Sequence, residues 1–286
     1  MSEALNISTG MMAISDGEFA ALRDLIHQRF GINLTEQKRS LLVGRLQKLM
    51  RTRGFLTFQQ YIDFLTQDKS EQGLSELVDL ISTNHTYFNR EKDHFEYYFR
   101  HALPDVVAKL KKQNRRDLRV WCAGSSTGEE PYTLVMLMME YLGADYRNWD
   151  AGILATDISD RALSVARSGV YAQERVEQLP PNLRKKYFTT SGDGQLRVRD
   201  EVKCEVTYRR FNLMNASFPF KKPFQIIFCR NVMIYFDQPT RDALVARFHH
   251  HTESGGYLFI GHSETLGRAQ TLYRYLQPAL YQKGDA

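Results

Sequence analysis

Residues 120–134 read VWCAGSSTGEEPYTL, and this stretch decides the fold. An apolar run ends at Gly124, a polar loop follows, and a strongly apolar segment then continues to Leu142. This order predicts a β-strand, a glycine-containing loop and a helix. Such a unit lets a ligand approach the backbone closely where the strand ends and the helix begins.

The loop of this unit disfavours two common nucleotide sites. It lacks the GxGxxG spacing of dinucleotide-binding folds, and residues 124–133 contain no lysine for a triphosphate loop. Glu129 and Glu130 stand near the expected helix N-terminus, where carboxylates are favourable. They would repel a pyrophosphate but suit a cationic ligand, such as a sulfonium with its ammonium group. Helix capping by Thr127 and the two glutamates is the structural alternative.

Strands and helices alternate after this unit. The expected strands are residues 151–157, 224–231 and 255–261, the expected helices are residues 159–168 and 239–250, and residues 272–283 predict a final strand or hairpin. This alternation predicts an α/β fold with a parallel sheet and right-handed crossovers. Residues 171–209 lie between the expected strands 151–157 and 224–231, and they contain a glycine-rich turn and alternating runs. They predict a small inserted subdomain with an antiparallel hairpin or sheet.

The N-terminal part of the chain predicts four helices and no strand. Asp16 is expected to cap the first helix, and Gly31 and Gly54 are expected to end the first two. The apolar stripe of the second helix is expected at Leu41, Leu42, Leu46 and Leu49. We therefore expect an all-helical domain over residues 1–82 and a second domain over residues 83–286.

Composition points to a protein of the cytoplasm. The chain has 286 residues, 43% of them hydrophobic and 25% charged, which is typical of a soluble globular protein. No apolar run approaches the roughly 20 residues that cross a bilayer, and residues 1–16 lack the features of a secretion signal.

Neither the cysteines nor the histidines predict a metal site. Cys122, Cys204 and Cys229 are isolated in the sequence, so they form no disulfide framework or CxxC pair. Cys122 and Cys229 lie in apolar runs and are expected to be small core residues. The consecutive histidines 249–251 end a helix without a cluster of other metal ligands, so we interpret them as surface residues.

Polar side chains follow two of the expected strands. Asp157 ends the strand of residues 151–157, where an acidic residue can accept hydrogen bonds from ribose hydroxyls; a helix N-cap is the alternative. Arg230 and Asn231 follow a buried strand, at the edge where open α/β sheets bind ligands, and Tyr235 comes four residues later. A structural ion pair is the alternative for Arg230.

Five motifs, in this order and spacing, resemble the CheR chemotaxis methyltransferases. They are STNHTYFNR (82–90), AGSSTGEEPY (123–132), TDIS (156–159), ARSGVY (166–171) and FCRNVMIYFD (228–237). The resemblance covers residues 15–282. It implies a class I methyltransferase with a Rossmann-like sheet that uses S-adenosylmethionine (SAM) to convert receptor glutamates into methyl esters, with S-adenosylhomocysteine as product.

The resemblance also implies roles for individual residues. It implies that Asn84, Thr86 and Arg90 close over SAM. It places Glu130 near the amino group of SAM and Asp157 at the ribose. It places Asn212 and Leu213 at the adenine, and Arg230 and Asn231 in the reaction pocket. We expect Arg90 or Arg230 to orient the acceptor carboxylate and Tyr235 to pack near the methyl group.

The second helix is strongly basic, and the whole chain carries a net charge of +5 with a pI near 9.0. Its cations are Lys38, Arg39, Arg45, Lys48, Arg51 and Arg53. A solvated basic face is the simpler explanation. The resemblance favours docking onto the acidic, helical cytoplasmic region of a chemoreceptor, because opposite charges steer association. We expect a monomer that neither inserts into the membrane nor binds nucleic acid.

One departure from the family concerns the inserted hairpin. In enteric members a longer hairpin loop grips a pentapeptide at the receptor C-terminus, whereas the turn here, residues 189–194, is short. We therefore expect direct recognition of the receptor without this tether.

Two other functions remain open from the sequence. A nucleic-acid methyltransferase is suggested by the basic helix and by NVMIY (231–235), but the charge excess is modest and no RNA-binding module is present. A non-catalytic SAM-sensing adaptor is the other, although the expected ligand positions are all present.

Overall fold

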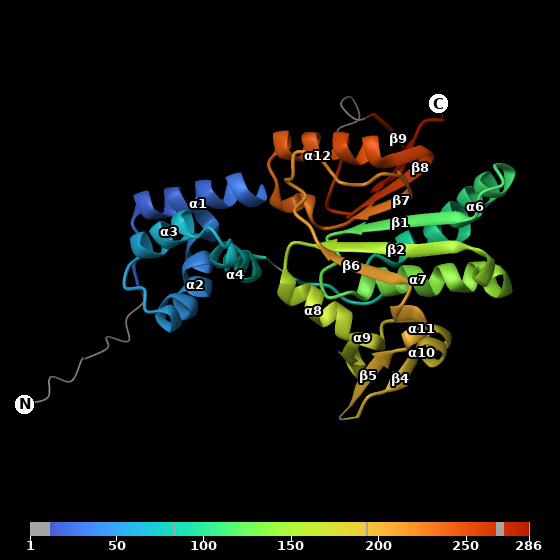
Figure 1. Ribbon diagram of the computed structural model, residues 1–286, viewed down its shortest axis with the longest axis horizontal. Helices are drawn as coiled ribbons and strands as arrows, with labels where there is room; N and C mark the ends of the chain where they lie inside the picture. Colours follow the sequence, from blue (N-terminus) through green and yellow to red (C-terminus); the bar gives the residue numbers. More distant parts are fainter. Residues whose placement is uncertain (1–11, 83, 193, 267–271, 286) are drawn as a thin grey trace, which may run out of the picture. The chain divides into compact units, whose positions relative to one another are not determined.

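The computed structural model describes residues 12–82, 84–192, 194–266 and 272–285. The chain divides into two compact units, residues 1–83 and residues 84–286 (Figure 1). Within the described residues, no helix is long and apolar enough to cross a membrane.

The first unit is helical, as expected. Its elements are α1 (Asp16–Phe30), the 3-10 turn η1 (Glu36–Lys38), α2 (Arg39–Arg53), α3 (Phe58–Gln67) and α4 (Gln72–Ile81). The cap of α1 is Ser15 and not the expected Asp16. The Ser15 hydroxyl accepts from the Glu18 amide, and the Glu18 carboxylate accepts from the Ser15 amide, which makes a capping box. Gly31 and Gly54 end α1 and α2 in the left-handed conformation.

The apolar stripe of α2 differs from the expectation. Leu42 and Leu46 are buried, but Leu41 is 53% exposed and Leu49 is only half-buried. Met50 completes the row because it follows Leu42 and Leu46 at four-residue spacing, which keeps all three on one face of a helix.

The second unit contains a seven-stranded sheet in the order β6-β2-β1-β7-β8-β10-β9. The strands are β1 (Asp117–Ala123), β2 (Asp150–Asp157), β6 (Val206–Arg210), β7 (Phe224–Cys229), β8 (Thr252–Ile260), β9 (Tyr273–Gln277) and β10 (Leu280–Lys283). The first five strands in this order are parallel, and β10 and β9 add an antiparallel hairpin. The expected α/β class and the C-terminal hairpin are confirmed.

Helices cover both faces of this sheet (Figure 1). The helical elements of this unit outside the insertion are α5 (Lys92–Tyr97), the π-turn η2 (Tyr98–Ala102), α6 (Leu103–Lys112), α7 (Glu129–Leu142), η3 (Gly143–Asn148), α8 (Asp160–Ser168), η4 (Met233–Tyr235) and α12 (Gln238–His251). Side chains of β1 alternate between the two faces. Val120 and Cys122 join the core that includes Tyr132 of α7, while the Trp121 ring packs 5.3 Å from the Phe248 ring of α12.

The inserted subdomain is a separate antiparallel sheet in the order β3-β5-β4. Its elements are β3 (Val170–Ala172), α9 (Gln173–Val176), α10 (Pro181–Tyr187), β4 (Phe188–Thr190), β5 (Gln195–Val198) and α11 (Asp200–Lys203). The last strand expected in the insertion is instead β6, which pairs in parallel with β2. Val206 and Tyr208 are buried in the main sheet, so this segment belongs to the main core.

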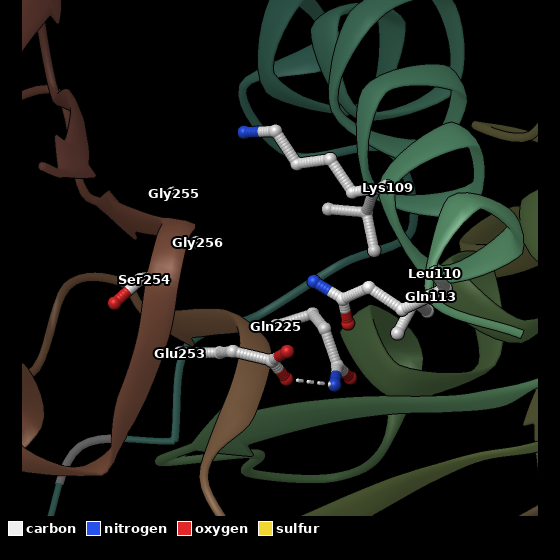
Figure 2. Close-up of a pocket in the computed structure, with 9 residues that line it drawn as sticks. Lys109, Leu110, Gln113, Gln225, Glu253, Ser254, Gly255 and Gly256 are labelled. Atoms are coloured by element: carbon white, nitrogen blue, oxygen red, sulfur yellow. Dashed lines mark hydrogen bonds between the residues drawn. The ribbon is translucent and has the colours of Figure 1, made fainter. Parts of the chain in front are cut away.

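A pocket lies at the amino ends of β7 and β8 (Figure 2). The motifs lie at the carboxyl ends of the parallel strands, which is the opposite edge of the sheet. It lies between α6 and the start of β8, where Glu253 accepts a hydrogen bond from Gln225. Its volume is about 30 Å³. That is room for a few water molecules, and we assign no ligand to this pocket.

Candidate active site

The loop after β1 is tightly packed around two glycines. The backbone angle φ is +88° at Gly124 and +97° at Gly128, and such positive values are adopted readily only by glycine. A Cβ atom on Gly124 would clash with the Val232 side chain, and one on Gly128 would lie 2.9 Å from the Tyr208 hydroxyl. Both positions therefore require glycine for the loop to adopt this conformation and pack against its neighbours.

Asp157 ties this loop to the end of β2. One carboxylate oxygen accepts from the Ser126 amide at 2.7 Å, and the other accepts from the Ser159 amide at 2.9 Å. Asp157 is 9% exposed. The N-cap of α8 is Ser159, whose hydroxyl accepts from the Ala162 amide, so the capping alternative for Asp157 does not hold.

The start of the second unit reaches the same loop. The Asn84 side-chain oxygen lies 3.5 Å from the Ser126 hydroxyl. The Arg90 guanidinium donates to the His85 carbonyl at 2.6 Å and lies over the Tyr87 ring. Arg90 is half-buried, and this bond uses one of the five N–H groups of its guanidinium.

Arg230 is the centre of a buried ion-pair cluster. Its guanidinium donates to Glu130 at 2.6 Å, to Glu91 at 3.0 Å and to the Arg90 carbonyl. The side chain is 2% exposed and lies over the Phe95 ring. Burial of the guanidinium opposes ionisation, but the two carboxylates outweigh it and raise the pKa of Arg230.

This cluster contains the ion pair that was the structural alternative for Arg230, because its donors are directed at Glu91 and Glu130. The role of Arg230 at the acceptor carboxylate stays a prediction, as does that of Arg90. Glu130 also accepts from the Cys122 thiol at 3.0 Å, so both of its oxygens are held. Burial would raise the pKa of Glu91, but Arg230 and Asn231 lower it below its usual value.

Asn231 is held in an unusual backbone conformation by a buried carboxylate. Its φ is +59°, which costs free energy for a residue with a side chain. Glu264 accepts from the amides of Asn231 at 2.9 Å, Ile234 at 3.2 Å and Gly261 at 2.5 Å. Burial raises the pKa of Glu264, although these backbone donors oppose the shift. Tyr235 lies four residues after Asn231, in η4.

The end of β6 brings two further predicted residues to this edge. The Phe211 amide donates to the Asp157 carbonyl at 2.9 Å, so the next residue, Asn212, begins a loop beside the end of β2. The Asn212 side chain accepts from the Met214 amide, and Leu213 is buried. This placement follows from the membership of β6 in the main sheet.

Glu91, His94 and His262 form a group whose possible ligand atoms lie within 4.8 Å of one another. The Glu91 carboxylate is already bound by Arg230 and Asn231. Since the Arg230 guanidinium occupies the place of a cation beside this carboxylate, we assign no metal to the group.

One of the three histidines at the end of α12 differs from the expectation of a surface position. His250 is exposed and His249 is half-buried, but His251 is buried and stacks against the Phe218 ring at 5.5 Å. Successive helical residues point about 100° apart, which turns His251 toward the core. Cys122 and Cys229 are buried, as expected.

Both units match models of one family. Residues 84–281 match the model described as CheR methyltransferase, SAM binding domain. Residues 17–82 match the model described as CheR methyltransferase, all-alpha domain. The chain belongs to the CheR methyltransferase family.

Relatives within this family match over most of their length. The chemotaxis protein methyltransferase of Borreliella burgdorferi is 42% identical over 270 residues, 94% of this chain and 95% of that protein. A probable chemotaxis protein methyltransferase of Rhizobium etli is 37% identical over 91% of this chain and all of that protein. The Escherichia coli chemotaxis protein methyltransferase is 35% identical over 93% of each chain.

CheR membership confirms the expected fold class, the SAM-dependent methyltransferase activity and the cofactor. The residues at the carboxyl edge fit SAM by their chemistry. Glu130 and Asp157 supply carboxylates suited to an ammonium group and a ribose diol, and a carboxylate oxygen can accept more than one hydrogen bond. The roles of the individual residues stay predictions.

Sequence reasoning missed three residues that organise this CheR site. Glu91 and Glu264 hold Arg230 and Asn231, and Arg175 of the insertion contacts the loop after β1. The one usable signal was the position of Glu91 next to Arg90. Glu264 and Arg175 come from segments whose packing the sequence did not predict.

Proposed function

We propose that this chain transfers the methyl group of SAM to glutamate side chains of chemoreceptors, giving glutamate methyl esters and S-adenosylhomocysteine. The observation that carries the proposal is the match of both units to CheR models, together with relatives named as chemotaxis protein methyltransferases. The chemistry of the site agrees with it, because the reaction needs placement of two charged reactants more than it needs a base.

The acceptor itself requires no activation. A glutamate side chain has a reference pKa of about 4.3 and is ionised at neutral pH. SAM, when bound, supplies a methyl group already activated by its sulfonium. The work of the chain is then to hold the acceptor carboxylate in line with that methyl group and to exclude water.

Arg90 is our candidate for orienting the acceptor carboxylate. Its guanidinium is half-buried and makes one described hydrogen bond, to the His85 carbonyl, so N–H groups remain for a second, planar partner. Tyr235, in the turn after Asn231, is the candidate to pack beside the methyl group. Arg230 positions Glu130 by its buried ion pair.

The carried-over residues other than Tyr235 are proposed to bind SAM. They are Asn84, Thr86 and Arg90 over the ligand, Glu130 at its amino group, Asp157 at the ribose, Asn212 and Leu213 at the adenine, and Arg230 and Asn231 in the reaction pocket. Support comes from their gathering at one edge of the sheet, where open α/β sheets bind ligands.

The receptor-binding surface is proposed to be the basic face of α2. Some of the cations of this surface are engaged within the first unit. Arg39 pairs with Asp16, Arg45 donates to the Leu80 and Ile81 carbonyls, and Arg53 pairs with Glu76. Lys48 and Arg51 are exposed and are the positions we expect to face the acidic receptor helices most directly. Lys38 lies just before α2.

Three further features belong to the same proposal. The chain acts in the cytoplasm as a monomer. It recognises the receptor without a pentapeptide tether, since β4 and β5 are joined by only residues 191–194, of which residue 193 lies outside the described residues. Tight binding of a receptor C-terminal pentapeptide in a calorimetric titration would overturn the last point.

The function is tested by incubating the protein with SAM and receptor-containing membranes and mapping the modified receptor peptides by mass spectrometry. The proposal expects one methyl group on each of a few glutamates of the receptor's helical cytoplasmic region. Replacement of a mapped glutamate by alanine should remove its signal. Methyl groups found only on lysine, arginine or nucleic acid would refute the proposal.

A further inference from the structure

Arg175 is a cation of the inserted subdomain that reaches two segments of the SAM site. It lies in α9, and its guanidinium donates to the Thr86 carbonyl at 2.8 Å. The same nitrogen forms an ion pair with the Glu129 carboxylate and lies 3.4 Å from the Thr127 hydroxyl. One side chain thus joins the segment of residues 84–90 to the loop after β1.

The contact between Arg175 and Glu129 is important for stability because Glu129 is buried. Its side chain is fully buried, whereas that of Arg175 is 39% exposed. Burial raises the pKa of Glu129, and the Thr127 hydroxyl and Arg175 oppose that shift. A buried carboxylate that loses its cation is strongly destabilising for its surroundings. Glu129 is the first residue of α7, next to Glu130, so any adjustment there displaces a proposed SAM ligand.

A second contact from the root of the insertion supports the same loop. The Tyr171 hydroxyl of β3 donates to the Thr127 carbonyl at 2.7 Å. The Tyr171 ring also packs edge-on against Phe88 at 5.0 Å, and the Phe188 ring of β4 packs against Phe88 at 5.6 Å. The insertion therefore contacts both SAM-site segments through a polar and an aromatic connection.

We propose that Arg175 is a positioning residue for SAM, which holds residues 84–90 and the loop after β1 together so that the inserted subdomain sets the affinity for the cofactor. Arg175 does not touch the reacting atoms. It acts through Glu129 and the Thr86 backbone. The inference rests on the proposed assignment of Thr86 and Glu130 to SAM.

The test is a set of variants titrated with SAM and with S-adenosylhomocysteine by calorimetry. Arg175→Met keeps much of the aliphatic stem and removes the charge. We expect its Kd for SAM to rise about tenfold, within the range typical of coupling between neighbouring sites. The matched control is Arg199→Met, an exposed arginine of the same subdomain, which should bind SAM like the wild type.

A charge-neutral pair separates positioning from general damage. In Glu129→Gln with Arg175→Met, no buried charge is left unpaired, so we expect most of the lost affinity to return. Arg175→Lys should restore part of it. These two variants keep the proposal testable if Arg175→Met alone fails to fold, and thermal unfolding without ligand shows whether each variant is folded.

The pH dependence of the Kd for SAM separates a positioning role of Arg175 from a purely structural one, because a purely structural role would not change it. The titratable groups that face Glu129 are Arg175 and the Tyr171 phenol, whose pKa is raised well above its usual range. In Arg175→Met, the buried Glu129 carboxyl group has no cationic partner. It is neutral and does little harm at low pH, but once it ionises it lowers the affinity for SAM. The ratio of variant to wild-type Kd should therefore increase from pH 5.5 to pH 8 (roughly the range of a raised carboxyl pKa), and the double variant should lose this dependence.

Either of two results overturns the inference. One is a Kd of Arg175→Met within twofold of wild type across the pH range. The other is a loss of affinity that neither Arg175→Lys nor the double variant repairs. If the wild type itself does not bind SAM, the cofactor assignment of the proposed function fails first, and this inference fails with it.

Discussion

At the scale of single residues, carboxylates organise the site. Glu91 and Glu130 accept hydrogen bonds from the Arg230 guanidinium, and Glu264 accepts one from the Asn231 backbone amide. The types and order of the expected ligand residues were predictable from the motifs. The buried state of Arg230 was not, because its partner Glu91 reaches it from a distant part of the chain.

Asp157 offers the most direct test at this scale. Asp157→Ala removes the acceptor for the Ser126 amide and the proposed acceptor for the ribose. Loss of a charge-assisted pair is worth about 1.5–3 kcal/mol, so we expect the Kd for SAM to rise at least about tenfold. Calorimetry measures it. Arg90→Ala should also weaken SAM binding. Normal SAM binding by both variants would show that the roles implied by the resemblance to CheR are wrong for these two residues.

Glu264 should matter for turnover through Asn231. Glu264→Gln keeps the shape but leaves one oxygen for three amide donors. An unsatisfied buried donor costs about 1–3 kcal/mol, and Asn231 should then leave its left-handed conformation. We expect kcat to fall more than the Kd for SAM rises. Single-turnover kinetics, measured at the level of bound SAM found in the wild type, would reveal this fall in the rate of methyl transfer. An unchanged rate would exclude a role of Glu264 in turnover.

At the scale of elements, hydrophobic periodicity predicted the helices of the first unit and most strands of the main sheet, but not the short helices α9, α10 and α11 of the insertion. The expected helices of the first unit and the strands β1, β2, β7 and β8 are present. The exception is β6, which resembles the neighbouring hairpin strands because it is short and alternating. Only its partner, β2, places it in the main sheet, and sequence periodicity does not specify the partner of a strand.

The basic face of α2 is an element whose role can be tested by charge reversal. Lys48→Glu with Arg51→Glu should lower the rate of receptor methylation, and the loss should shrink as salt is added, because screening weakens charge steering. Two controls are informative. Lys69→Glu reverses an exposed charge elsewhere in the same unit and should have little effect. SAM affinity should be unchanged in all variants. Equal losses in both sets would argue against a docking role.

At the scale of the whole molecule, a buried histidine links stability to pH. His94 is fully buried, and desolvation followed by the nearby Arg230 charge lowers its pKa to about 4, despite Asp93 and Glu91. In the unfolded chain its pKa is about 6.5. Between these values the unfolded state binds the proton and the folded state does not, so acidification destabilises the fold.

His94→Gln isolates this contribution. The free energy of unfolding of wild type minus that of the variant should be largest near pH 7 and should fall between about pH 6.5 and pH 4, by up to roughly 3 kcal/mol. Urea unfolding at several pH values measures it. Taking the difference cancels the opposing effect of Glu129 and Glu264, whose raised pKa values favour the folded state at low pH. A difference that does not change with pH would contradict a neutral buried His94.

The central claim concerns the chemical bond that the enzyme makes. The most direct test is methyl transfer from tritiated SAM to receptor-containing membranes, followed by mild alkali. The account predicts label on a receptor-sized protein and its release by alkali as volatile methanol, which identifies a carboxyl methyl ester. Alkali-stable label, or label on nucleic acid, would contradict it. SAM binding without transfer to any receptor tried would instead support a non-catalytic adaptor.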